Sequence, residues 1–164
     1  MSYVYAEGPR LGWLSLDHDR RWRVFDLAVE ECRRQETGPD MVELLLRGYD
    51  LAWTYASDET PWPRLDEIIT IAYMLEPKVD DQLRSTPVTF RDGGTGAPAS
   101  NLQHVMEGLV YSVQGADPDL WTKHFLSAHP FVDGNGRTAW VMRTWLTASW
   151  DWPDPLPRYE FTTH

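Results

Sequence analysis

The sequence has 164 residues and a mass of 19.0 kDa, which is the size of one ordinary domain. Apolar residues make up 42% and charged residues 24%, a balance that excludes wholesale disorder. Acidic residues outnumber basic ones by 25 to 15, and the resulting net charge of -10 argues against a nucleic-acid partner. Any bound phosphate must therefore sit in a local basic pocket.

The sequence carries no signal for a membrane or an oxidising compartment. No stretch approaches the ~18 consecutive apolar residues of a membrane span. Residues 1–7 lack the basic and apolar regions of a signal peptide. A single cysteine, Cys32, cannot form a disulfide within the chain. We expect a cytoplasmic protein with no membrane partner.

The apolar residues follow a helical period in the first half of the chain. Asp17 is expected to cap a first helix that ends in the basic pair 33–34, because cations favour helix C-termini. Gly38-Pro39 separates it from a second helix that starts at Asp40 and carries Trp53. A third helix is predicted from Leu65 to about Leu75, before Pro77.

The second half contains a different pattern before the helices resume. Within residues 86–99, Val88 and Phe90 alternate with Thr89 and Arg91, and Gly93-Gly94-Thr95-Gly96 follows, which predicts a short β-hairpin. We expect one mostly α domain over residues 1–164, with N-terminal helices at 17–57 and an extended, proline-stiffened tail at 152–164. The later helices are predicted at about 100–114, 118–128 and 135–149, with Asp117 as a cap and Pro118 at a first helical position.

The segment His129-Pro130-Phe131-Val132-Asp133-Gly134-Asn135-Gly136-Arg137 ends one predicted helix and opens another. Glycines at a helix start let backbone N–H groups turn inward and form a nest for an anion. Arg137, in the first turn, can fork onto phosphate oxygens. The segment therefore predicts a phosphate site.

The same segment supplies groups that fit phosphate chemistry. Asp133 is a hard oxygen ligand for a phosphate-bound Mg²⁺. His129 is suited to accept the proton of an attacking hydroxyl. Pro130 stiffens the turn and Phe131 is expected to anchor it in the core. The alternative is a purely structural turn with a capping Asn135, a surface arginine and a satisfied histidine.

This segment resembles the Fic family signature His-Pro-Phe-x-Asp/Glu-Gly-Asn-Gly-Arg-x-x-Arg, and it matches everywhere except the last arginine. The resemblance extends over residues 65–150. It implies a Fic-like helical domain in which a β-hairpin flap aligns the target segment, here at Pro87-Val88-Thr89-Phe90.

The resemblance also implies roles for single residues. His129 would be the general base on a Ser, Thr or Tyr hydroxyl of a target protein, and Asp133 would hold Mg²⁺. The usual outcome in the family is transfer of AMP from ATP to the target. Phosphates would be bound by Gly134, Asn135, Gly136 and Arg137.

Trp140 stands where the family has its second arginine. Counting 100° per residue gives a buried stripe of Val141, Met142, Trp145 and Ser149 and places Trp140 far off it, so Trp140 either faces the site, as a nucleotide contact, or lies on the surface. Arg143, one turn further on, is a candidate to reach back toward the phosphates.

Three functions therefore stay open. The first is AMP transfer, and the second is a kinase similar to Doc toxins, a related branch that phosphorylates its target and also lacks this arginine. The third is an impaired module that only binds. No inhibitory Ser/Thr-x-x-x-Glu-Gly/Asn segment occurs in the sequence, so an inhibitor is either a separate antitoxin chain or absent. A toxin, an effector delivered into another cell and a tailoring enzyme would share this sequence pattern.

Overall fold

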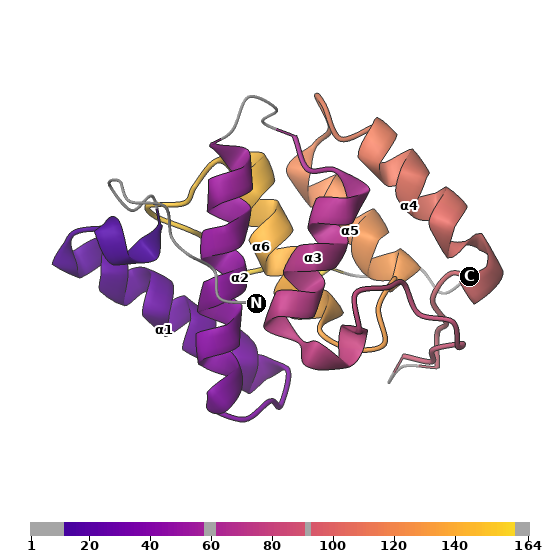
Figure 1. The fold of residues 1–164 in the computed structure, drawn as a ribbon, viewed down its shortest axis with the longest axis horizontal. Coiled ribbons are helices and arrows are strands. Elements are labelled where there is room, and N and C mark those ends of the chain that lie inside the picture. The colour runs from indigo at the N-terminus through magenta and orange to yellow at the C-terminus, as the bar shows by residue number, and fades with distance from the viewer. Residues whose placement is uncertain (1–11, 58–61, 91–92, 160–164) are drawn as a thin grey trace.

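The computed structural model describes residues 12–57, 62–90 and 93–159, and this part of the chain is mostly helical. The α-helices are α1 (His18–Arg34), α2 (Asp40–Ala56), α3 (Leu65–Leu75), α4 (Leu102–Tyr111), α5 (Pro118–Ala128) and α6 (Asn135–Thr147) (Figure 1). Short 3₁₀ helices are η1 (Trp13–Ser15), η2 (Pro77–Val79) and η3 (Ala99–Asn101). No helix in the described ranges has both the length and the apolar character of a membrane span.

Local sequence signals set the helix starts. The Asp17 carboxylate accepts a hydrogen bond from Arg20 N at 3.0 Å, and the Asp117 carboxylate accepts one from Leu120 N at 2.9 Å. Each bond satisfies a backbone donor that the first turn of a helix leaves without a partner. Pro118 occupies the first position of α5, as the sequence predicts.

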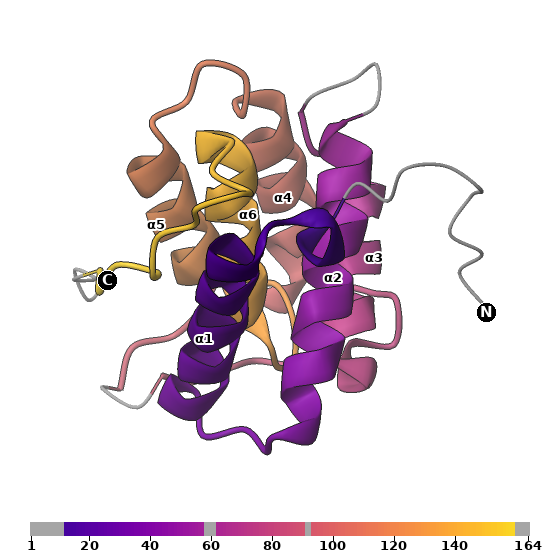
Figure 2. The ribbon, with the colours of Figure 1, turned by 90° about the vertical axis from the view of Figure 1, so that its left-hand side faces the viewer.

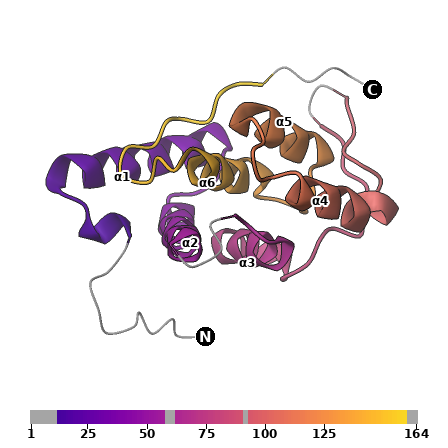
Figure 3. The same cartoon turned by 90° about the horizontal axis from the view of Figure 1, so that it is seen from above.

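Helix α6 lies at the centre of the fold and contacts α1, α2, α3 and α5 (Figures 1 and 3). It is therefore buried on almost every side and has no solvent face over most of its length. The sequence-based placement of Trp140 off the buried stripe is wrong, because its side chain is only 1% exposed. A one-sided stripe describes a surface helix, not a central one.

The segment predicted as a β-hairpin contains one antiparallel bridge between its described residues. This bridge joins Thr89 and Thr95, and Phe90 N donates to Gly94 O at 2.6 Å. The described residues contain this bridge but no β-strand, so the two-stranded hairpin is not confirmed. Residues 91–92, at the tip of the predicted hairpin, lie outside the described part.

The C-terminal segment runs extended along α1 and α6 (Figure 2). Arg23 Nε donates to Pro153 O at 2.9 Å, and Arg34 Nη1 donates to Leu156 O at 3.0 Å. In return, Leu156 N donates to the buried Glu31 carboxylate at 3.2 Å. These bonds attach the described part of the tail to the helices that surround α6.

Candidate active site

The loop between α5 and α6 has a residue with left-handed backbone angles at each end. His129 is the C-cap of α5 with φ of 51°, and Gly134 is the N-cap of α6 with φ of 75°. A Cβ at Gly134 would lie 3.0 Å from the Glu76 Cβ, so glycine satisfies both the backbone angle and the space. The loop therefore reverses direction quickly and brings His129 close to the N-terminus of α6.

Asn135 holds this loop in shape. Phe131 N donates to Asn135 Oδ1 at 3.0 Å, and Asn135 Nδ2 donates to Phe131 O at 2.8 Å. Phe131 is fully buried and packs against Phe125, with the ring centroids 6.3 Å apart. Because both polar atoms of the Asn135 side chain bond to the loop, phosphates at this turn would meet backbone N–H groups.

His129 is suited to accept a proton. Burial lowers the pKa of His129, with a smaller contribution in the same direction from the charge of Arg84. A hydrogen bond with the Leu126 backbone and the charge of Asp133 act in the opposite direction. The imidazole is therefore neutral at neutral pH, which is the state a general base requires. The Phe90 ring packs edge-on against the His129 imidazole, with the ring centroids 4.9 Å apart.

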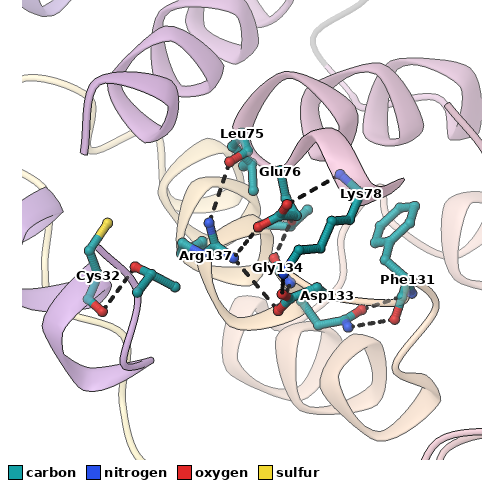
Figure 4. Close-up of polar contacts among 11 residues, drawn as sticks. Cys32, Leu75, Glu76, Lys78, Phe131, Asp133, Gly134 and Arg137 are labelled. Atoms are coloured by element: carbon teal, nitrogen blue, oxygen red, sulfur yellow. Dashed lines mark hydrogen bonds and ion pairs between the residues drawn. The ribbon is translucent and has the colours of Figure 1, made fainter. Parts of the chain in front are cut away.

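Asp133 is the half-exposed carboxylate of the loop, with its side chain 45% exposed. Its Oδ1 accepts from Gly134 N at 2.8 Å, and its Oδ2 lies 3.4 Å from Lys78 Nζ (Figure 4). The described residues contain no group of three or more His, Cys, Asp or Glu side chains that could hold a metal. A lone accessible carboxylate fits Mg²⁺ only when the ligand's phosphates and water supply its other oxygens.

Arg137 is bound by protein groups in this structure, and one of them is Asp133, whose Oδ1 lies 3.7 Å from Nη2. The Arg137 side chain is fully buried, and Nη2 lies 3.1 Å from the carboxylate of Glu76, which is 1% exposed (Figure 4). Nη1 donates to Leu75 O at 3.4 Å, whereas Nε has no hydrogen-bond partner. The guanidinium thus ties α6 to the end of α3.

Neither of the other two expected nucleotide contacts on α6 reaches the loop. Trp140 packs inside the core, and its Nε1 donates to Asp154 O at 3.0 Å. Arg143 Nε donates to Asp119 at 2.9 Å, in the first turn of α5 and thus at the end of that helix opposite His129. The expectation that Arg143 reaches back toward the phosphates is therefore wrong, because the Arg143 guanidinium is paired with the Asp119 carboxylate.

Sequence analysis missed Arg84, which connects the predicted flap to the loop. Arg84 is 3% exposed and donates through Nε to His129 O at 2.6 Å and through Nη1 to Thr86 O at 2.8 Å. Its Nη2 bonds to the carbonyls of Ala97 and Ala128, and its backbone N donates to Pro130 O. An arginine outside any motif gives no sequence signal of such a role.

The predicted flap residues alternate in exposure. Val88 and Phe90 are half-buried, whereas Pro87 and Thr89 are exposed. The half-buried pair faces the loop side, since the Phe90 ring contacts His129. This alternation is what an extended segment lying over a surface produces.

The model of the Fic/DOC family matches residues 62–147, which is more than half of the chain. The chain belongs to the Fic/DOC family. No curated protein matches the chain.

Two solved structures of Fic proteins share the fold. A Fic-domain-containing signaling protein from Bacteroides thetaiotaomicron aligns at a TM-score of 0.57 and 18% identity, over 65% of this chain and 46% of its own. A Fic family protein from Desulfovibrio desulfuricans aligns at a TM-score of 0.61 and 18% identity, over 80% of this chain and 49% of its own. The chain thus covers just under half the length of each.

Proposed function

We propose that this Fic protein transfers AMP from ATP to a hydroxyl group of a target protein, with His129 as general base. The proposal rests on one arrangement: a neutral, half-buried imidazole and a half-exposed carboxylate lie on the same short loop before a helix N-terminus. Such a terminus favours anions through its free N–H groups and its dipole. In this proposal, base, cation ligand and phosphate cradle would therefore occupy one place.

In the proposed step, the target oxygen attacks the α-phosphorus of ATP and its proton passes to His129. The bond from the α-phosphorus to the bridging oxygen breaks, and pyrophosphate leaves. Mg²⁺ held by Asp133 would offset phosphate charge. The backbone N–H groups of Asn135 and Gly136 would bind phosphate oxygens, while the Gly134 N–H holds the Asp133 carboxylate. The flap at 87–90 would align the target chain.

A kinase is the second candidate, and the burial of Trp140 favours it. In the family, the second arginine stabilises phosphates in the orientation that delivers AMP. A Trp140 packed into the core leaves that position without a charge. In this alternative the γ-phosphorus is attacked and ADP leaves. An impaired module that only binds is the third candidate.

The test uses ATP labelled at the α or at the γ phosphate, with Mg²⁺ and cell lysate. The proposal expects label from the α position, lost in His129→Ala and kept in His124→Ala, an exposed histidine on α5. Label from the γ position alone would overturn AMP transfer in favour of the kinase. Binding of ATP without label from either position would favour the binding module.

A further inference from the structure

The charge of Arg137 is already neutralised inside the protein. The carboxylate of Glu76 uses Oε2 for the ion pair with Arg137 and Oε1 to accept a hydrogen bond from Lys78 N at 3.2 Å. Both members of the ion pair are at most 1% exposed. A buried cation with a buried counter-ion offers little net charge to a ligand.

Helix α6 also lacks a free charge at its other two candidate positions. Trp140 carries no charge, and the Arg143 guanidinium is paired with the Asp119 carboxylate. A nucleotide triphosphate carries several negative charges, and the chain itself has a net charge of -10. The site therefore needs a cation from another element to bind phosphates well.

Lys78 lies where such a cation is needed. Its side chain is 69% exposed, and Nζ lies 3.4 Å from the Asp133 carboxylate beside the Gly134 turn (Figure 4). An exposed ion pair of this length is weak, so the ammonium can exchange its partner at little cost. A lysine acts as a mobile point charge on a flexible stem, which suits a phosphate chain.

The backbone of Lys78 is held in position, although its side chain is exposed. Lys78 lies in η2, where Pro77 takes the first position and the Glu76 carboxylate accepts from Lys78 N. The short helix ends at Val79, and its C-cap, Asp80, has left-handed backbone angles. Glu76 therefore does two things at once: it is the buried counter-ion of Arg137, whose Nη2 also lies 3.7 Å from Asp133 Oδ1, and it fixes the start of the Lys78 side chain at the mouth of the loop.

We propose that Lys78 is a phosphate-binding residue that supplies the charge missing at position 140. The assignment rests on the proposed function, because it takes the ligand to be a nucleotide with two or more phosphates. When such a ligand and its divalent cation reach Asp133, Lys78 Nζ leaves the carboxylate and pairs with a phosphate oxygen. No covalent bond forms or breaks in this exchange.

Calorimetric titration with Mg²⁺-ATP, Mg²⁺-ADP and adenosine tests this assignment. We expect Lys78→Ala to weaken ATP and ADP binding at least about tenfold, with adenosine unaffected and Lys78→Arg close to wild type. Lys123→Ala is the matched control, since positions 78 and 123 hold the two lysines of the sequence. Unchanged ATP binding in Lys78→Ala would overturn the assignment.

The two proposals fail in different ways. If Lys78→Ala binds ATP like wild type while wild type still labels a target from the α position, only the role of Lys78 is wrong. If Lys78→Ala loses ATP binding but wild type labels nothing, the phosphate role stands and the transferase proposal fails. If wild type binds ATP no better than adenosine, both are wrong.

A second readout does not depend on a variant. Pyridoxal 5′-phosphate carries a phosphate and an aldehyde, and the aldehyde condenses with an amine to an imine and water. Reduction of the imine with borohydride makes the mark permanent for peptide mapping. We expect Lys78 to be marked in preference to Lys123 and to be protected by Mg²⁺-ATP. Equal marking of both without protection would contradict the assignment.

Discussion

The indole of Trp140 stacks on the ring of Tyr49, with the centroids 5.4 Å apart and the planes 28° from parallel. Tyr49 is fully buried on α2, and its hydroxyl donates to Trp150 O. The position that carries an arginine in the Fic signature thus joins three parts of this fold: α6, α2 and the C-terminal segment.

Trp140→Arg should unfold the protein more easily and should not improve transfer. It would lose the stacked indole and place a charge in the core, at a cost of about 3–5 kcal/mol. Urea denaturation measures the change in the free energy of unfolding. Tyr111→Arg is the control, because Tyr111 is 92% exposed and should change stability by about 0.5 kcal/mol or less. A stable Trp140→Arg variant with faster transfer would contradict this account.

Asn135→Ala should loosen the loop of the active site. It leaves the N–H and C=O of the buried Phe131 without their partners, which costs about 1–3 kcal/mol for each group. Asn135→Asp keeps an acceptor for Phe131 N and should lose less stability, although its carboxylate faces Phe131 O. Thermal unfolding measures both variants, and an Asn135→Ala protein as stable as wild type would show that the two Asn135–Phe131 hydrogen bonds do not hold the loop.

Transfer should persist at acidic pH. A general base works only when neutral, and burial holds the pKa of His129 below the ordinary value of 6.5. The acid limb of the rate profile should therefore have its midpoint below pH 6.5. Single-turnover rates between pH 5 and 8 check this, with binding of ATP measured at each pH as a control. A midpoint at or above pH 6.5 would show that burial does not lower the pKa of His129.

Arg84→Gln should raise the pKa of His129, because the positive charge of Arg84 is one of the effects that lower it. Arg84→Lys keeps that charge but cannot serve four carbonyls, so it should lose stability while leaving the pKa nearer to wild type. NMR titration of the His129 ring, assigned by comparison with His129→Ala, measures the pKa. An unchanged His129 pKa in Arg84→Gln would remove the electrostatic part of this role.

Short-range signals predicted the helices well. The caps at Asp17 and Asp117, and the prolines that separate elements, fixed most helix bounds to within a few residues. The helix predicted at 100–114 is shorter, because η3 precedes α4 and the helix ends at Tyr111. Contacts within one helical turn are enough to set where these helices begin and end.

Long-range contacts could not be predicted in the same way. Glu76 and Arg137 are 61 residues apart, and Arg84 and His129 are 45 apart, so no local pattern announces either pair. The burial of Trp140 depends on how many helices surround α6, which periodicity along a single helix does not reveal. The motif predicts where the site lies, but the packing around it decides which charges a ligand can reach.

The central position of α6 divides the active site into two parts with different freedom to evolve. Substitutions on the helix change the packing of four neighbours, so selection for folding constrains them whatever the chemistry requires. Asp133 and Lys78 face solvent and can change with little effect on the core. A lineage built on this fold would therefore diversify its ligands at the mouth of the loop while the helix behind it stayed the same.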